Sequence, residues 1–397
     1  MGARLELNWL KKSLISHRQK YAVFHTHTIS LMIEVSEVNN QLNSNMFEGL
    51  SEHDHEQILV CNDNLTGLKA LIAIHNTVLG PGLGGTRMWK YSSEAEAVRD
   101  VLRLSRGMTY KASISGLNLG GAKAVIFGDS KTDKTEALMR RFGRFVNNLA
   151  GKYITAEDVG TTTQDMEFVN METNHVVGLP MSRGGGGDPS PVTAYGVYVG
   201  MKASAKKRWG SDNLAGKTIS VMGIGKVGMH LLEYLHKDGA KFYVADMNEA
   251  ALKEAANRFD AKVVSVEDIY DVDAQIFAPC ALGGILNTDT IGRLKSEIIA
   301  GAANNQLEDE LVHGPLIKKK GILYAPDFLI NAGGLINVYS EYTGYNRENA
   351  IRDTERIYET LTSIYELSES RDIPTQEAAT ELAKKRIEDV MHVKSRI

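Results

Sequence analysis

Apolar and polar positions alternate along this chain in the pattern of an α/β protein. From Met46 onward, short β-branched and apolar runs are followed by longer segments with helical periodicity. The pattern predicts strands at residues 56–63, 68–80, 123–128 and 152–160, and helices at residues 92–108 and 131–151. Ser93 and Glu96 have the spacing of a capping box at the start of the first helix. Residues 46–185 are therefore expected to form an α/β substrate domain.

A glycine- and proline-rich break leads into a second α/β unit. The run of four glycines at residues 184–187 and the two prolines after it cannot lie inside a helix or strand, so they predict a hinge or mobile loop. A helix is expected at residues 191–210. Residues 218–248 then have the order strand, glycine turn, helix, strand, and further strands are expected at residues 274–281, 296–304 and 321–327. Residues 190–340 are predicted to form a doubly wound Rossmann domain, separated from the first domain by a cleft.

The carboxyl-terminal segment, residues 341–397, is predicted to be helical and to return to the substrate domain. Residues 347–372 have the periodicity of one long amphipathic helix, and Pro374 separates it from a last helix at residues 376–390. The apolar stripe on the long helix is more typical of a core or subunit contact than of a cofactor site. Its members are Tyr358, Leu361, Ile364 and Leu367.

Composition excludes several classes of protein. The 397 residues, 43% hydrophobic and 24% charged, suffice for two domains with a full core each. A net charge of −4 disfavours a general nucleic-acid surface, and no apolar run reaches the length of a membrane span. Cys61 and Cys280 lie far apart and form no CxxC motif, which suits a reducing cytoplasm. His53 and His55 lack further ligands, so they are interpreted as surface residues and no metal site is predicted.

Residues 1–45 differ from the rest of the chain. They carry five Lys/Arg against three Asp/Glu, and their apolar run is too short for a membrane anchor. An organellar targeting segment is only weakly indicated. We expect Met46 to be the physiological start and the preceding extension to be non-native or poorly ordered. The alternative, a basic tether to nucleic acid or a membrane, predicts that removing the extension changes localisation or activity.

The second unit contains a dinucleotide-binding fingerprint. Gly223, Gly225 and Gly228 follow a strand and open a helix, which allows a tight turn and close approach of the backbone to a pyrophosphate. Asp246 ends the next strand, where its carboxylate can accept hydrogen bonds from the ribose hydroxyls. Because that charge repels a 2′-phosphate, NAD is predicted over NADP. The predicted contact turn comprises Gly223, Ile224, Gly225, Lys226, Val227 and Gly228.

Two lysines in the first domain are the strongest candidates for chemistry. Lys111 and Lys123 lie in RGMTYKASISGLNLGGAKAVIFG, and Lys123 ends a Gly-Gly-Ala-Lys turn. An ammonium beside a second cation, where water is excluded, is pushed towards its neutral form and can act as a base near pH 7. The alternative reading, that both are solvated surface charges, is the commoner one for a lysine taken at random.

Nine ordered motifs resemble the amino-acid dehydrogenases of the glutamate, leucine, phenylalanine and valine family, most closely its leucine branch. The resemblance runs from Met46 to about residue 390. The motifs are GPGLGGTRMW at 80–89, GMTYK at 107–111, GLNLGGAK at 116–123, ITAEDVGTT at 154–162, DPSPVTAYGVY at 188–198, GIGKVG at 223–228, APCALGG at 278–284, GAANNQL at 301–307 and APDFLINAGGLINV at 325–338.

The resemblance implies reversible NAD-dependent oxidative deamination of an L-amino acid to the 2-oxo acid, ammonia and NADH. It assigns Lys111 to the substrate carboxylate as a permanent cation and Lys123 to the general base that activates water. Asp158 is assigned to proton transfer at the substrate nitrogen, although an isolated Asp is more often a helix cap or ion-pair partner. The resemblance also implies a homo-oligomer, often an octamer.

Further contacts are implied by the same resemblance. The loop glycines Gly84 and Gly85 are expected to let the substrate approach the backbone. The remaining substrate contacts are expected from Met108, Val177, Leu335 and Val338. The remaining cofactor contacts are expected from Thr193, Cys280, Ala281, Asn304 and Asn331.

The amino acid itself is the least determined feature. Pockets for leucine, valine and phenylalanine differ by a few methylene-sized changes, each worth about 1–3 kcal/mol. The GGAK turn favours leucine and other branched-chain substrates, whereas GLPMSRGGGGDPS and GIGKVG resemble the phenylalanine branch. Val177 stands where leucine enzymes are expected to have threonine. Phenylalanine or another aromatic substrate is the alternative, and a catalytically silent NAD-binding relative is the remote one.

Overall fold

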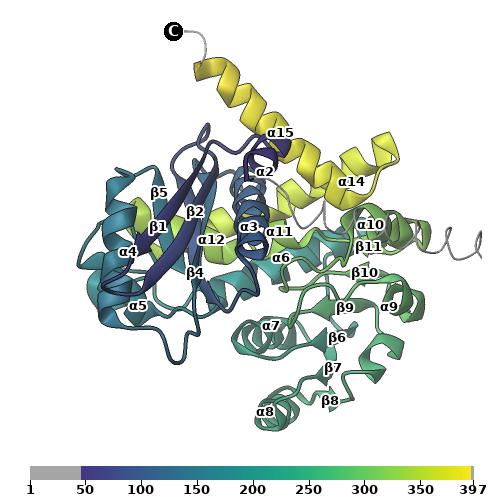
Figure 1. Cartoon of the computed structure of the whole chain (residues 1–397). Helices are drawn as coiled ribbons and strands as arrows, with labels where there is room; N and C mark the ends of the chain where they lie inside the picture. The colour runs from purple at the N-terminus through teal and green to yellow at the C-terminus, as the bar shows by residue number, and fades with distance from the viewer. Residues whose placement is uncertain (1–45, 395–397) are drawn as a thin grey trace, which may run out of the picture.

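Two β-sheets, one from each half of the chain, organise the protein (Figure 1). The computed structural model describes residues 46–394, so the predicted extension at residues 1–45 lies outside the described residues. The order is α2 (Met46–Glu52), β1 (Gln57–Asp63), β2 (Leu68–Asn76), β3 (Gly82–Trp89), α3 (Glu94–Ile114), β4 (Gly120–Phe127), α4 (Glu136–Asn148), β5 (Tyr153–Glu157), α5 (Thr163–Asn170), η1 (Met181–Arg183), α6 (Ser190–Trp209), β6 (Thr218–Met222), α7 (Lys226–Lys237), β7 (Lys241–Ala245), α8 (Glu249–Phe259), β8 (Lys262–Val263), η2 (Asp268–Asp271), β9 (Ile276–Pro279), α9 (Thr288–Arg293), β10 (Ile298–Ile299), α10 (Glu310–Lys319), β11 (Leu323–Tyr324), α11 (Asp327–Ile330), α12 (Gly333–Tyr342), α13 (Arg347–Glu355), α14 (Ile357–Arg371) and α15 (Thr375–Lys394).

The first sheet has the order β1-β2-β4-β3-β5. β1 and β2 are antiparallel, β2 runs antiparallel to β4, and β3, β4 and β5 are mutually parallel. The four strands predicted here are confirmed. At the start of α3, Ser93 accepts from the amide of Glu96, but the Glu96 carboxylate accepts from Ser92, so only half of the predicted capping box forms.

The sequence pattern missed β3, because its Gly-Leu-Gly-Gly start resembles a loop. The interpretation of Gly84 and Gly85 as loop residues is wrong, since both are buried in this strand. A Cβ at position 84 would lie 1.7 Å from the carbonyl oxygen of Ala122, and one at position 85 would lie 2.5 Å from that of Glu157. Close approach of neighbouring backbones, rather than turn geometry, therefore requires glycine here.

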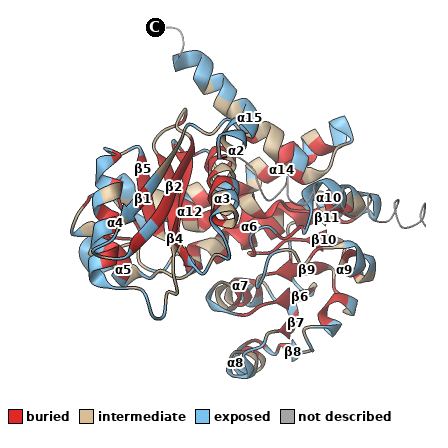
Figure 2. Ribbon diagram, viewed as in Figure 1, coloured by how far each residue is buried: buried red, intermediate tan, exposed pale blue. Residues whose placement is uncertain are grey.

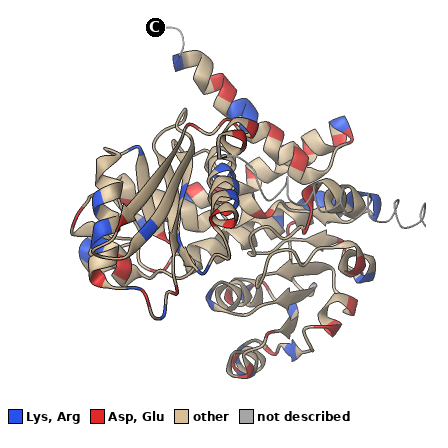
Figure 3. Ribbon diagram, viewed as in Figure 1, with Lys and Arg blue, Asp and Glu red and all other residues tan. Residues whose placement is uncertain are grey.

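The second sheet is wholly parallel, with the order β11-β10-β9-β6-β7-β8. Counted from β6, this is the doubly wound order of a Rossmann domain, and the strand order reverses between β6 and β9. The strands predicted after the glycine turn are confirmed. Strands of both sheets are mostly buried, whereas the charged residues gather on the outer helices (Figures 2 and 3).

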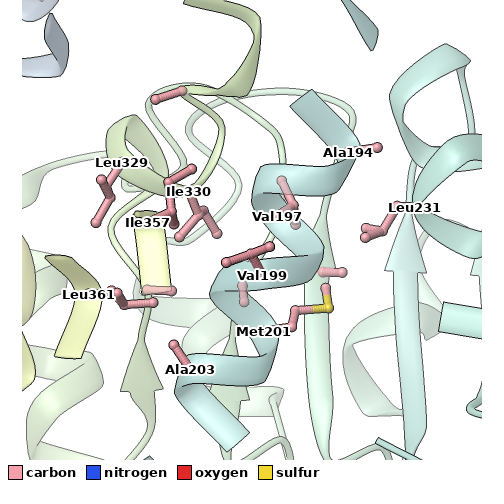
Figure 4. Close-up of a cluster of buried hydrophobic side chains, with 14 of the residues drawn as sticks. Ala194, Val197, Val199, Met201, Ala203, Leu231, Leu329, Ile330, Ile357 and Leu361 are labelled. Carbon is pink, nitrogen blue, oxygen red and sulfur yellow. The ribbon is translucent and has the colours of Figure 1, made fainter. Parts of the chain in front are cut away.

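α6 joins the two halves and is buried on most of its surface. Its residues pack against the helices that follow the second sheet and against α7, as the labelled side chains in Figure 4 show. Gly196 and Gly200 permit this contact: a Cβ at position 196 would lie 2.8 Å from the carbonyl oxygen of Ile330. Apart from its basic last turn, α6 is thus a core helix.

The carboxyl-terminal helices differ in one respect from the prediction. The expected long helix is split at Arg356 into α13 and α14, which both pack on α6, whereas α15 lies against α3. Arg386 of α15 donates to the carbonyl oxygens of Leu117 and Ser113 at 2.7 and 3.2 Å. The chain end thus holds the turn between α3 and β4. The boundaries placed at residues 185 and 340 stay predictions. Within residues 46–394, no helix is long and apolar enough to cross a membrane.

Gly196→Ala should lower the free energy of unfolding by about 1–3 kcal/mol, because the added methyl group overlaps the backbone of Ile330. Gly107→Ala is the matched control, since Gly107 also lies inside a long helix but has open space around it. That change should stabilise by about 0.5–1 kcal/mol through helix propensity. Urea unfolding measures both, and equal effects at the two positions would contradict the packing argument.

Candidate active site

Lys123, which is buried, and Asp158, which is half-buried, form an ion pair in the first sheet. Lys123 lies in β4 with 5% of its surface exposed, and Asp158 directly follows β5. The Lys123 Nζ and Asp158 Oδ2 atoms are 3.0 Å apart. β3 lies between these two strands in the sheet, so the side chains meet across it. The chain thus brings a base candidate and a carboxylate together.

Arg87 is a second cation at this carboxylate, and the sequence analysis did not identify it. Its Nε donates to Asp158 Oδ2 at 3.0 Å and its Nη1 donates to Asp100 Oδ2 at 2.9 Å. Arg87 lies in β3, the strand that was taken for a loop. Its place within the GGTRMW motif was the only signal available.

The charge of Asp158 is set by these neighbours. Burial alone would raise the pKa of its carboxyl, but the charges of Lys123 and Arg87 outweigh burial and hold the pKa below its ordinary value. Both cations contact Oδ2. The backbone amide of Asp158 donates to Thr161 Oγ1 at 2.9 Å, which fixes the turn after β5.

Lys111 lies in the last turn of α3 and reaches the second half of the chain. Its Nζ donates to Asn331 Oδ1 at 2.6 Å. Burial, with a further contribution from Lys123, lowers the pKa of Lys111 to about 8, and Asp327 and Asp158 oppose that shift. The role of Lys111 as a cation for a carboxylate stays a prediction: with this pKa the lysine is mostly charged at pH 7 and loses its proton as the pH rises through about 8.

Asn331 and Asp327 surround Lys111 from α11 and its carboxyl end. Asn331 Nδ2 donates to Ala302 O at 3.1 Å and Asn304 Oδ1 at 2.7 Å, so the amide oxygen of Asn331 is turned towards Lys111. Asn331 thus links Lys111 to Asn304, another predicted cofactor residue, and the expected cofactor contact of Asn331 stays a prediction. Asp327 is buried and accepts from Tyr324 Oη at 3.0 Å. Burial raises the pKa of Asp327, against the opposing effects of that hydrogen bond and of Lys111.

The four side chains predicted for the substrate pocket belong to one apolar cluster. Val177 and Leu335 are buried in it, and Met108 and Val338 pack against it. Leu83 and Ala156 belong to the same cluster, from β3 and β5. The substrate roles of these residues and of Gly84 and Gly85 stay predictions.

The glycine turn after β6 has the features of a dinucleotide site. Gly223 has a φ of +98°, Gly225 has open space where a Cβ would stand, and α7 begins without a side-chain cap. Its first amides can therefore receive a phosphate. Asp246 Oδ2 accepts from the Ile224 amide at 2.7 Å, which ties the turn to the end of β7. The residues present fit the predicted NAD.

Some of the other predicted cofactor residues lie at this turn, and the rest lie in α6, in α7 or at the ends of other strands of the second sheet. Ala281 lies beside Gly223, whose added Cβ would be 2.6 Å from the Ala281 Cβ. The side chain of Ile224 is buried, whereas Lys226 Nζ forms an ion pair with Asp188 Oδ2 at 3.1 Å. The others are distributed as follows: Val227 in the first turn of α7, Thr193 in the first turn of α6, Cys280 after β9, and Asn304 beside Asn331.

The sequence suggested that His53 and His55 are surface residues, but the structure shows that neither is fully exposed. Both are partly buried, and the ring of His55 lies 4.7 Å from that of His75. His55 Nε2 lies 2.9 Å from Leu102 O, so these rings fasten the start of the described chain to α3.

Two family profiles match this chain. Residues 55–175 match the family described as "Glu/Leu/Phe/Val dehydrogenase, dimerisation domain". Residues 184–394 match "Glutamate/Leucine/Phenylalanine/Valine dehydrogenase". Together they include every α-helix and strand from β1 to α15, and the gap between them, residues 176–183, directly precedes the four glycines.

Individual relatives agree with these profiles. The leucine dehydrogenase of Geobacillus stearothermophilus is 53% identical over 350 residues, which is 88% of this chain and 95% of that protein. The phenylalanine dehydrogenase of Caldalkalibacillus thermarum is 48% identical over 347 residues, 86% of this chain and 93% of the relative. The crystal structure of L-tryptophan dehydrogenase from Nostoc punctiforme superimposes with a TM-score of 0.78 at 45% identity, covering 87% of this chain and 99% of that one.

The charge of Lys111 should control the binding of carboxylates. The inhibition constant of 4-methylpentanoate, which has no amino group to titrate, should increase about tenfold per pH unit above pH 8, because only the ammonium attracts the anion. In Lys111→Arg the guanidinium stays charged, so this dependence should vanish even if binding is weaker. An inhibition constant that is flat to pH 10 in the unaltered protein would contradict the assignment.

Proposed function

The chain belongs to the Glu/Leu/Phe/Val dehydrogenase family and is an amino-acid dehydrogenase, and from this we propose that it catalyses the reversible NAD-dependent oxidative deamination of L-leucine and other branched-chain amino acids. The products are the 2-oxo acid, ammonia and NADH. Five leucine dehydrogenases are 51–53% identical to this chain over 350 residues, which supports the branched-chain substrate.

The observation that carries the proposal is the convergence of Lys111, Lys123 and Asp158. Lys123 touches Asp158, and Lys111 crosses to Asn331, in the half of the chain that has the glycine turn. A group that binds a carboxylate, a base candidate and an acid thus lie within one charge network. Oxidative deamination of an α-amino acid needs these three roles together.

Each residue has a task that follows from its contacts. Lys111 binds the substrate carboxylate, with Asn331 orienting the ammonium. Asp158 accepts a hydrogen bond from the substrate nitrogen and exchanges a proton there. Lys123, after it passes its ammonium proton to Asp158, removes a proton from the water that attacks the imino carbon. The 3.0 Å between Lys123 Nζ and Asp158 Oδ2 gives the path for the transfer to Asp158.

A bound nicotinamide would accept the hydride from the substrate α-carbon. The backbone amides of the turn Gly223–Gly228 and the start of α7 would hold such a cofactor. Asp246 favours NAD, because its carboxylate can accept from ribose hydroxyls and repels a 2′-phosphate.

A homo-oligomer belongs to the proposal, since the first matching family is described as a dimerisation domain. An octamer is the finer prediction, which light scattering of the purified protein can test. A cytoplasmic location also stays a prediction, motivated by the two free thiols of Cys61 and Cys280.

Initial rates with a panel of amino acids test the proposed function. L-Leucine, L-valine and L-isoleucine should give a higher kcat/KM than L-phenylalanine, L-tryptophan or L-glutamate, and NAD⁺ should support higher rates than NADP⁺. NADH formation is followed by its absorbance. A preference for L-phenylalanine or L-tryptophan would mean that the substrate is an aromatic amino acid instead of a branched-chain one. No turnover with any amino acid would refute the proposal.

Lys123→Ala should lower kcat by about 10²–10⁴-fold, because the base is removed. Binding of NADH should be unchanged, since the glycine turn belongs to the other sheet. Steady-state kinetics measure the change in kcat, and a fluorescence titration with NADH measures cofactor binding. Turnover near that of the unaltered protein would exclude Lys123 as the base.

A further inference from the structure

Arg87 joins three elements of the first domain at the ion pair. It lies in β3 with 23% of its side chain exposed. One end of the guanidinium holds Asp158, after β5, and the other holds Asp100, in α3. The planar fork of an arginine suits such a bridge between two carboxylates, since a lysine offers only a point charge.

The far end of this bridge is itself fixed. Asp100 Oδ2 accepts from Tyr91 Oη at 2.8 Å, and its Oδ1 accepts from Arg103 Nη2 at 3.1 Å. Asp100 lies in the same helix as Lys111. The orientation of Asp158 is therefore coupled to the helix that presents the carboxylate-binding lysine.

We propose that Arg87 is a positioning residue for this reaction: it holds one oxygen of Asp158 in place and keeps the carboxylate ionised, so that the other oxygen meets the substrate amino group. The inference rests on the proposed function, because it assigns Asp158 to the substrate nitrogen. In this proposal Arg87 acts through Asp158 and needs no contact with the substrate, and its other end is held by Asp100.

The groups that face Asp158 determine what the loss of Arg87 would do. Lys123 of β4 and Arg87 of β3 contact it, Lys111 of α3 lies within its field, and Tyr153 of β5 and Tyr91 have phenols that interact with it electrostatically. Of these groups, two cations touch the carboxylate. Removing Arg87 leaves Lys123 alone to offset burial, so the pKa of Asp158 should rise.

Arg87→Gln and Arg87→Lys, measured in the full-length protein, test the proposal. In Arg87→Gln the acid limb of kcat/KM for L-leucine should move up by about 1–2 pH units, since a neighbouring arginine lowers an Asp pKa by about 1–3 units. Its kcat should fall about 100-fold, the usual cost of a misplaced catalytic group, while the KM for NAD⁺ stays within about twofold. Arg87→Lys keeps the charge but not the fork, so it should return the acid limb towards its original pH without restoring kcat.

Arg140→Gln is the matched control. Arg140 also bridges two carboxylates, Glu172 and Glu136, in the same domain, but it does so on the surface. Its loss should leave the pH profile and kcat unchanged.

The outcomes separate the two proposals. Turnover of L-leucine by the unaltered protein with an acid limb that does not move in Arg87→Gln would overturn the role of Arg87 alone. Absence of turnover in the unaltered protein would instead refute the proposed function. If thermal unfolding shows that neither Arg87 variant folds, Arg87 is a structural residue and the inference is wrong.

Discussion

The buried contact between Lys123 and Asp158 is the constraint on which the arrangement of the first domain depends. An ammonium with 5% of its surface exposed is costly without a partner, and the penalty for an isolated buried ion is several kcal/mol. The partner lies 35 positions along the chain, after β5, so only the folding of the sheet brings it to Lys123. The parallel order β4-β3-β5 supplies it, and the glycines of β3 let the three backbones approach.

A second constraint joins the two halves of the molecule. Lys111 donates to Asn331, which is oriented in turn by Ala302 O and Asn304. Lys111, which we propose binds the substrate carboxylate, is thus held by the half of the chain that contains the glycine turn. The buried carboxylate of Asp327 supports the charge of Lys111 from the same side. In the proposed reaction, substrate binding and the contact between the two halves of the chain therefore depend on the same few atoms.

The sequence predicted much of this, and its errors have identifiable causes. Periodicity and the glycine fingerprint were sufficient for the parallel second sheet, since each depends on local pattern. Periodicity failed at β3, where glycines required by backbone contact resemble a loop, and at Arg356, where a helical pattern continues across a break between two helices. Arg87 was missed together with β3, because its two carboxylate partners come from α3 and from the turn after β5.

The sequence by itself determined the class of fold, the dinucleotide turn and the identity of the two lysines, because these are encoded in short runs of consecutive residues. Only the tertiary structure decided which neighbouring groups determine the protonation of the site residues. Burial lowers the pKa of Lys111 to about 8 against the opposing charges of Asp327 and Asp158, and Asn331, 220 positions away, accepts a hydrogen bond from this lysine. Such effects come from the distances between side chains remote in sequence and from the exclusion of water around them, and neither quantity is present in a linear chain.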